Sequence, residues 1–204
     1  MTLLSLLLHG GILMYVLLLI SIAVLGIVIE KYRQFMCVKR DNQKLADLLK
    51  DQTKLEGLRS VLSDEPRISS LGIMLQKLFF AETNDEDLIH QSMESAANLE
   101  LHRLEKGMGW LSTFAAIAPL IGFLGTVIGM VRVFMNIQAH SSAGVDISLL
   151  AGGIWEALLT TIGGLIVGIV AIIFYNDLVQ KLENIVKDMQ ESAIEYTIRM
   201  KNLL

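Results

Sequence analysis

Cysteine, proline and charge are all scarce in this chain of 204 residues. The single cysteine, Cys37, excludes an intramolecular disulfide, and we interpret it as an ordinary buried or half-buried thiol. Only 19% of the residues are charged, whereas 53% are hydrophobic, and the mean hydropathy is +0.54. With only two prolines, this composition leaves two classes, a membrane protein or one ordinary soluble domain, and the length of the apolar runs distinguishes them.

Three predominantly apolar segments are long enough to cross a bilayer, which takes roughly 20 residues in helical form. The sequence therefore predicts an all-α integral membrane protein with three transmembrane helices, extended by long cytoplasmic helices. The first 29 residues contain no Lys or Arg and no small-residue cleavage site after a short apolar core. We therefore expect an uncleaved first span in place of a signal peptide.

The distribution of basic residues predicts the orientation. Twelve of the seventeen Lys and Arg residues fall between positions 30 and 109 and four fall after 176, whereas the N-terminus and the link from 136 to 146 have none. By the positive-inside rule, the N-terminus is periplasmic and the C-terminus cytoplasmic. The net charge of −4 comes from mixed acids and bases, so no nucleic-acid partner is expected.

The predicted parts are a periplasmic N-terminus at 1–10, a first transmembrane helix at 11–29, a cytoplasmic helical domain at 30–106, a second transmembrane helix at 107–132, a short periplasmic link at 133–146, a third transmembrane helix at 147–176 and a cytoplasmic C-terminal helix at 177–204.

Two patterns predict helices in the cytoplasmic parts. Thr83 and Glu86 have capping-box spacing, and the helix that follows is expected to run into the second span with Gly107 and Gly109 as its weak points. After the third span, apolar side chains recur on one helical face: Leu178, Leu182, Ile185, Met189 and Tyr196. This stripe packs either on the chain's own cytoplasmic helices or against copies of the chain.

The second and third spans both carry small residues at helical spacing, which let membrane helices approach closely. These residues are Ala118, Gly122, Gly125, Thr126 and Gly129 in the second span, and Ala157, Thr161, Gly164 and Gly168 in the third. They serve either to pack the three helices of one chain or to pack a larger assembly. The polar residues in the same spans favour the assembly.

Glu156 is the most unusual of these polar residues, because it lies about a third of the way into the third span from its outer end. A carboxylate at membrane depth costs several kcal/mol unless it is paired, protonated or hydrated, so it indicates a functional site. Thr160 lies one turn from Glu156, whereas Thr161 is rotated by about 140°. Together with Thr126, these hydroxyls either bond to backbone carbonyls of their own helices or line a path for a small cation. The nearby acid favours the path.

The remaining titratable residues form no recognisable catalytic pattern. No metal-ligand, nucleophile or phosphate-loop spacing is present, so we predict no catalytic residue, no metal site and no cofactor other than the translocated ion. Arg132, near the outer end of the second span, either pairs with Asp146 or extends to the membrane interface, and we favour the interface. The histidines are scattered: His9, His90, His102 and His140.

Two motifs in the spans resemble those of a known family. The motifs are A-P-L-x-G-F-L-G-T-V-x-G-M at 118–130 and G-G-I-x-E-A-L-L-T-T-x-x-G-L-x-V at 152–167, followed by Tyr175 and Asn176. They are similar to the ExbB/TolQ branch of the MotA/TolQ/ExbB proton-channel family. The close similarity covers residues 99–177, and the three-span layout agrees for the rest. The loop at 40–85 is too generic to contribute, and the four-span flagellar stator branch fits poorly.

The resemblance implies a homopentamer in the bacterial inner membrane, whose central pore holds the single membrane helices of an ExbD/TolR-type partner. Ion flow then transfers energy to a TonB/TolA-type protein in the periplasm. Thr126 and Thr161 match the family's pore threonines, Glu156 its membrane glutamate and Pro119 its helix-bending proline. Helical spacing pairs Glu156 with Thr160, but we rank Thr161 first, because a path between neighbouring subunits can use two faces of one helix.

The sequence leaves several alternatives open. The translocated ion is H⁺ or Na⁺, since threonine hydroxyls can serve either. The role is TonB-linked, Tol-type or that of another motor, depending on the partner. The alternative from a different class is a non-conducting membrane scaffold, which needs the small-residue faces but not Glu156.

Overall fold

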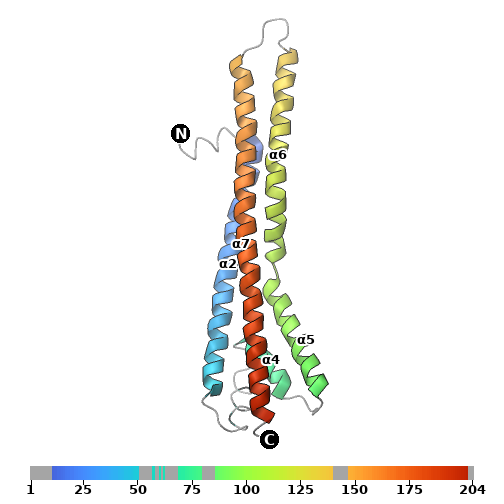
Figure 1. Ribbon diagram of the computed structural model, residues 1–204. Coiled ribbons are helices and arrows are strands. Elements are labelled where there is room, and N and C mark those ends of the chain that lie inside the picture. The colour runs from blue at the N-terminus through green and yellow to red at the C-terminus, as the bar shows by residue number, and fades with distance from the viewer. Residues whose placement is uncertain are drawn as a thin grey trace. The chain divides into compact units, whose positions relative to one another are not determined.

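The computed structural model describes residues 11–50, 57, 60, 62, 69–79, 86–139 and 147–201. The regular structure of these residues is α-helical, which confirms the predicted all-α class. The predicted periplasmic N-terminus, the start of the Thr83–Glu86 capping box and Asp146 lie outside the described residues. The main helices are α2 (Gly11–Lys50), α4 (Ser70–Phe79), α5 (Glu86–Glu105), α6 (Met108–Ala139) and α7 (Ile147–Lys201) (Figure 1).

Within the described residues, three helices are long and apolar enough to cross a membrane: α2, α6 and the Leu150–Tyr196 part of α7. Two of them extend well beyond the predicted spans. Helix α2 continues without a break from the first span to Lys50, and α7 continues from the third span to Lys201. Helix α6 continues past Arg132 to Ala139, into the segment predicted as a link. Helices α2 and α7 therefore extend the first and third apolar runs, as expected.

A break separates α5 from α6 at Gly107, which has a φ of 93°. This left-handed conformation suits glycine, because a side chain would be strained there. The amide of Lys106 still bonds to the carbonyl of His102, and the carbonyl of Gly107 accepts the amide of Trp110 at 3.3 Å. The predicted run into the second span is therefore interrupted at the first of its two weak points.

The chain divides into two compact units, which we describe separately. The apolar unit comprises the described residues of Met1–Ile29 and Gly107–Asn176 and contains α6 with the adjoining parts of α2 and α7. Its buried centre is formed by Met14, Leu17 and Ala118, with Ile20, Ile121, Leu159 and Val167 packed around them. Many large apolar side chains of this unit are exposed, such as Leu19 and Leu120, each 65% exposed. Such a surface suits lipid or other membrane helices.

The polar unit comprises the described residues of Glu30–Lys106 and Asp177–Leu204. Its core contains the stripe predicted on the C-terminal helix, since Leu178, Leu182, Ile185, Met189 and Tyr196 are all buried. The Tyr196 hydroxyl also donates a 2.9 Å hydrogen bond to the carbonyl of Ala46 on α2. Of the two predicted alternatives, the structure therefore favours packing on the chain's own helices.

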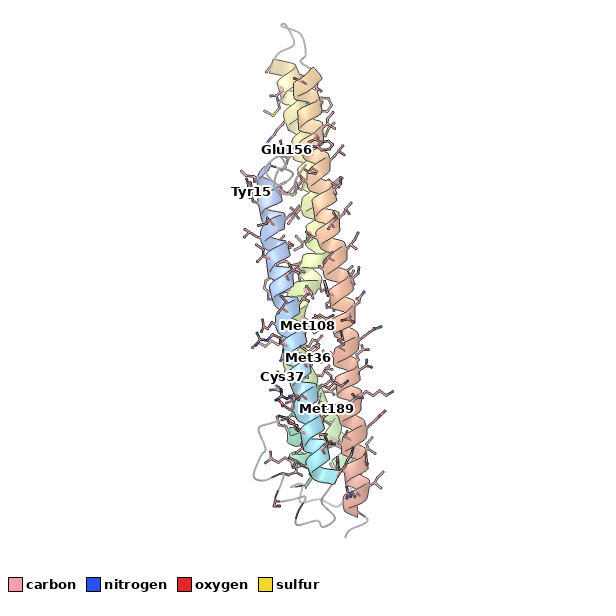
Figure 2. The ribbon with its side chains drawn as sticks, turned by 90° about the vertical axis from the view of Figure 1, so that its left-hand side faces the viewer. Tyr15, Met36, Cys37, Met108, Glu156 and Met189 are labelled. Carbon is pink, nitrogen blue, oxygen red and sulfur yellow. The ribbon has the colours of Figure 1, made fainter. Side chains whose placement is uncertain are left out.

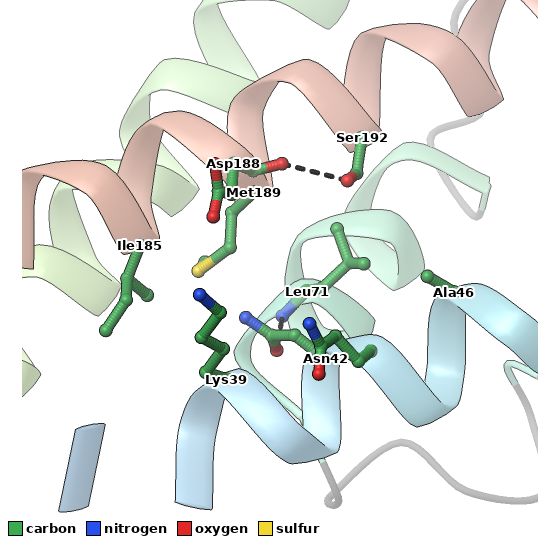
Figure 3. A pocket seen from close by; sticks show the side chains of 9 residues that line it. Lys39, Asn42, Ala46, Leu71, Ile185, Asp188, Met189 and Ser192 are labelled. Atoms are coloured by element: carbon green, nitrogen blue, oxygen red, sulfur yellow. Dashed lines mark hydrogen bonds between the residues drawn. The ribbon is translucent and has the colours of Figure 1, made fainter. Parts of the chain in front are cut away.

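Helix α4 is fixed in the polar unit by two side chains at its N-terminus. Ser69 Oγ accepts the amide of Gly72 at 2.9 Å, and Asn42 Oδ1 of α2 accepts the amide of Leu71 at 3.1 Å. Both oxygens satisfy amides that have no partner within the helix. Beside them lies a small hollow between α2, α4 and α7 (Figure 3). Its lining residues are Lys39, Asn42, Gln43, Ala46, Leu71, Ile185, Asp188, Met189 and Ser192.

Cys37 differs from its prediction, because the thiol is exposed and not buried or half-buried (Figure 2). The buried residue on this turn of α2 is Phe35, at 4% exposure. Two further residues rotate a helix by about 200°, which places Cys37 on the opposite face.

Candidate functional site

The two motifs lie on α6 and α7, whose small residues face each other within the apolar unit. A Cβ on Gly122 would lie 3.1 Å from the backbones of Thr160, Thr161 and Gly164, and one on Gly129 would lie 2.6 Å from the Cβ of Ala157. The helices approach this closely because glycine has no side chain. These faces therefore pack the helices of one chain, which is the alternative that the sequence analysis did not favour.

Pro119 and Gly168 form another close contact between the two helices. Proline lacks an amide hydrogen, so the carbonyl of Ala115 has no amide donor at the usual position one turn along α6. A Cβ on Gly168 would lie 2.6 Å from Pro119 Cγ and 3.2 Å from the oxygen of Ala115. Gly168 thus allows α7 to pack directly on the proline ring and the adjacent carbonyl.

The contacts between α6 and α7 follow one antiparallel register. The pairs Gly122 with Gly164, Gly129 with Ala157 and Pro119 with Gly168 are placed almost symmetrically about residue 143. This is the arrangement expected for two helices that run in opposite directions and are joined by one link. The register determines which polar side chains of the two motifs can meet.

The three candidate threonines use their hydroxyls in two ways. Thr126 donates to the carbonyl of Phe123 at 2.6 Å, and Thr160 donates to the carbonyl of Glu156 at 2.9 Å, both within their own helices. Thr161 instead donates across the hairpin to the carbonyl of Gly122 at 2.8 Å. Thr160 is 2% exposed, whereas Thr126 and Thr161 are half-buried. The two threonines favoured by the motif are therefore more accessible than the one favoured by spacing.

Glu156 is half-buried and lies beside Arg132 of α6. Its Oε1 is 3.6 Å from Arg132 Nη1, and the side chains are 36% and 61% exposed, respectively. Arg132 therefore lies beside an acidic residue that was not among the alternatives considered for it, which were Asp146 and the membrane interface. The pair fits the same antiparallel register, because positions 132 and 156 are symmetric about residue 144. An alignment of the glycines of the two spans in opposite directions would have indicated this pair from the sequence.

The third helix of the apolar unit also reaches Glu156. Gly11, the first residue of α2, has a φ of 66°, and a Cβ placed there would overlap Glu156 Oε1. Glycine is therefore required at this position by both its conformation and its closeness to the carboxylate. Figure 2 shows Glu156 at the level of the first turns of α2, near Tyr15.

A second polar cluster lies in the polar unit, directly after the ends of the predicted spans. The Tyr32 hydroxyl donates a short hydrogen bond to Asp177 Oδ2, and Lys181 Nζ lies 2.7 Å from the same oxygen and 4.3 Å from the centre of the Tyr32 ring. The hydrogen bonds from Lys181 and Tyr32 lower the pKa of the Asp177 carboxyl. The contact with Asp177 raises the pKa of Lys181 in turn. The sequence analysis did not single out these residues, since neither motif includes them.

Lys31 is buried at 5% exposure in the same unit. Its Nζ donates 2.9 Å hydrogen bonds to the carbonyl of Leu104, in the last turn of α5, and to Gln34 Oε1. Burial lowers the pKa of this lysine, and the neighbouring Glu30 opposes the effect.

Among the residues that the structure describes, no group of three or more His, Cys, Asp or Glu side chains could hold a metal ion.

Three long apolar helices, two of them joined by closely packed glycine faces, define the chain as a multi-pass α-helical membrane protein. The model of the MotA/TolQ/ExbB proton channel family matches residues 42–191, so the chain belongs to this family. The names of its relatives place it in the ExbB/TolQ branch.

Three relatives illustrate the similarity. The biopolymer transport protein ExbB-like 1 of Synechocystis is 31% identical over 175 residues, which cover 84% of this chain and 68% of that protein. The biopolymer transport protein ExbB of Neisseria gonorrhoeae is 35% identical over 118 residues, which cover 58% of this chain and 52% of the relative. The Tol-Pal system protein TolQ of Haemophilus influenzae is 35% identical over 107 residues, covering 52% and 46%.

Proposed function

We propose that this chain is the channel subunit of an inner-membrane motor driven by an ion gradient. With an ExbD/TolR-type partner, it would convert the flow of protons or sodium ions into mechanical work on a TonB/TolA-type periplasmic protein. The observation that carries the proposal is the set of polar side chains within the two motifs on α6 and α7: Thr126, Glu156, Thr160 and Thr161. Membership of a proton-channel family supports the same role.

The proposed assembly is a homopentamer, with the N-terminus in the periplasm and the C-terminus in the cytoplasm. Its central pore holds the single membrane helices of the partner. The exposed apolar side chains of the apolar unit support such an assembly, because they offer surface to neighbouring copies, to the partner and to lipid.

The ion is carried in this mechanism by a carboxylate of the partner. A protonated or ion-bound carboxylate is neutral and can face an apolar or hydroxyl-lined surface, whereas an unloaded one needs water or a polar group. Loading on one side of the membrane and unloading on the other therefore biases motion. Each elementary charge that crosses 100 mV supplies about 2.3 kcal/mol, which suffices for small steps.

In this proposal, Thr126 and Thr161 are the residues of this chain that contact the loaded carboxylate. Each is half-buried, and a hydroxyl can still accept a hydrogen bond while it donates one to a backbone carbonyl. Thr160 is buried against Gly125, where a Cβ would lie 2.6 Å from its Cγ2, so it supports the hairpin from within. Glu156 supplies a negative charge beside the path.

The first test is valine substitution of the two accessible threonines. Thr126→Val and Thr161→Val remove the hydroxyls at nearly constant volume, and we expect intact assembly with loss of ion-driven activity. Thr113→Val is a matched control, because Thr113 lies on α6 outside the motif and also donates to a carbonyl of its own helix, that of Gly109, at 2.8 Å. Normal activity in both motif variants would contradict the ion path.

Native mass spectrometry tests the assembly. The protein is extracted in detergent, alone and after co-expression with an ExbD/TolR-type protein. A homopentamer that takes up partner chains is the expected result. A monomer or dimer indifferent to that partner, together with full activity of Glu156→Ala, would favour the non-conducting scaffold instead.

A further inference from the structure

Glu156 is surrounded by two sources of positive potential that come from two other helices. The first is the Arg132 guanidinium of α6, 3.6 Å from Glu156 Oε1. The second is the N-terminus of α2, because the same oxygen lies against Gly11, the first residue of that helix. All three residues belong to the apolar unit, so the carboxylate lies where α2, α6 and α7 meet.

The start of a helix is a source of positive potential because of its backbone amides. The first four amides of a helix have no partner within it, and the aligned peptide dipoles add roughly half a positive charge at that end. Anions are stabilised there, most strongly within the first turn. Arg132 adds the full positive charge of a guanidinium group.

We propose that Glu156 is a fixed, ion-paired anion that joins the three membrane helices, and that Arg132 is the positioning residue that holds it in this state. The inference rests on the proposed function in one respect, namely that the loading and unloading carboxylate belongs to the partner. Glu156 itself neither takes up nor releases the translocated ion. It holds α7 in the register that brings the Thr161 hydroxyl to the carbonyl of Gly122.

The alternative is that Glu156 carries the proton. A proton carrier needs a neutral form that is stable at membrane depth, and a nearby guanidinium opposes that form. An isolated carboxyl group in the membrane, by contrast, is driven to take up a proton. Removal of Arg132 should therefore change the resting charge of Glu156, which infrared spectroscopy detects directly.

The experiment compares infrared spectra of the complex reconstituted in lipid, with and without the Glu156→Gln substitution. In the wild-type background, we expect that Glu156→Gln removes no carbonyl band of a protonated carboxyl group, because Glu156 is already ionised in this proposal. In the Arg132→Gln background, we expect such a band, and its loss in Arg132→Gln/Glu156→Gln assigns it to Glu156. Arg132→Lys keeps a cation at the position and should show no band, and Arg33→Gln, at an exposed arginine of α2, controls for loss of charge.

Each outcome either supports or overturns the proposal that Glu156 is a fixed, ion-paired anion. A Glu156 band in the wild-type complex, or its absence in Arg132→Gln, would overturn the inference. Should Arg132→Gln fail to assemble, recovery of the complex in Arg132→Gln/Glu156→Gln supports the pairing, whereas equal loss in the double variant contradicts it. The band reports the resting charge and not ion-driven activity, so it is independent of the Thr126 and Thr161 tests of the proposed function.

Discussion

The hydroxyl of Thr161 donates a 2.8 Å hydrogen bond across the α6–α7 hairpin to the backbone carbonyl of Gly122. The bond forms because Gly122 has no side chain, so the backbones approach to the distance that a threonine hydroxyl spans. Hydrogen bonds between membrane helices contribute about 0.6 kcal/mol on average. Most of the stability of the hairpin must therefore come from the close backbone packing around this bond.

Substitution of Gly164 tests that packing. A Cβ at this position would lie 2.6 Å from the carbonyl oxygen of Ala118 and 2.8 Å from the Cα of Gly122, and neither backbone atom can move aside alone. We expect Gly164→Ala to destabilise the protein by about 1–3 kcal/mol. Gly152→Ala is the control, because a Cβ there meets nothing within 4 Å. Equal melting temperatures of the two variants in detergent would contradict the packing.

The buried stripe of the C-terminal helix gives a second prediction. Leu182 is 4% exposed within the single chain, whereas Ile194 on the same helix is 42% exposed. Leu182→Ala should therefore cost about 2–5 kcal/mol in unfolding free energy, and Ile194→Ala much less. The measurement is denaturant unfolding followed by circular dichroism. A larger effect at Ile194 would indicate that the helix packs mainly on other chains.

The Tyr32, Asp177 and Lys181 cluster predicts a pH dependence at the acid end. Because hydrogen bonds from Lys181 and Tyr32 lower the pKa of Asp177, the carboxylate stabilises the fold above its unfolded pKa of about 3.9. This contribution is lost as the pH falls through the lowered folded-state pKa. Asp177→Asn should therefore melt below the wild type at pH 7, and the difference should shrink towards pH 3. A difference that stays constant across this range would argue against the ionised pair.

Lys31 gives a prediction about the end of α5. Lys31→Met removes the donor to the Leu104 carbonyl and leaves that buried oxygen unsatisfied, at a cost of about 1–3 kcal/mol. Amide hydrogen exchange in the last turn of α5 should become faster, while Lys44→Met, at an exposed lysine of α2, should not change it.

The same variant should alter stability at alkaline pH. Because burial lowers the pKa of Lys31, the unfolded chain binds more protons, and wild-type stability rises with pH between the folded-state pKa and about 10.4. Lys31→Met cannot show this rise, and thermal unfolding between pH 7 and 10 measures it. Identical slopes for the two proteins would show that the lysine is not desolvated.

The long elements could be predicted from the sequence because their signals are local. Apolar runs of bilayer length identified the three long helices, and four-and-three spacing identified the stripe from Leu178 to Tyr196. The partner of that stripe could not be predicted, since an apolar face fits the chain's own helices and a copy of the chain equally well. The structure favours its own helices.

Contacts between distant residues were predicted less well. The pairing of Arg132 with Glu156 depends on the register of the α6–α7 hairpin. The prediction favoured the membrane interface for Arg132 and considered only Asp146, which is closer in sequence, as an acidic partner. The contacts of Lys31 and Tyr32 could not be predicted, because a single Lys or Tyr directly after a membrane span is common and does not indicate a partner. The small-residue faces of α6 and α7 contact each other within the chain, whereas the sequence analysis favoured their use in a larger assembly.

The exposed thiol of Cys37 has a practical consequence, since it is the single cysteine of the sequence. A maleimide dye attaches to one position in each chain, and no cysteine has to be removed first. Stepwise photobleaching of labelled complexes then counts the protomers one at a time in a lipid environment. Spin labels at the same thiol would report distances between copies in the proposed assembly, so the sequence already carries a probe with which that assembly can be tested.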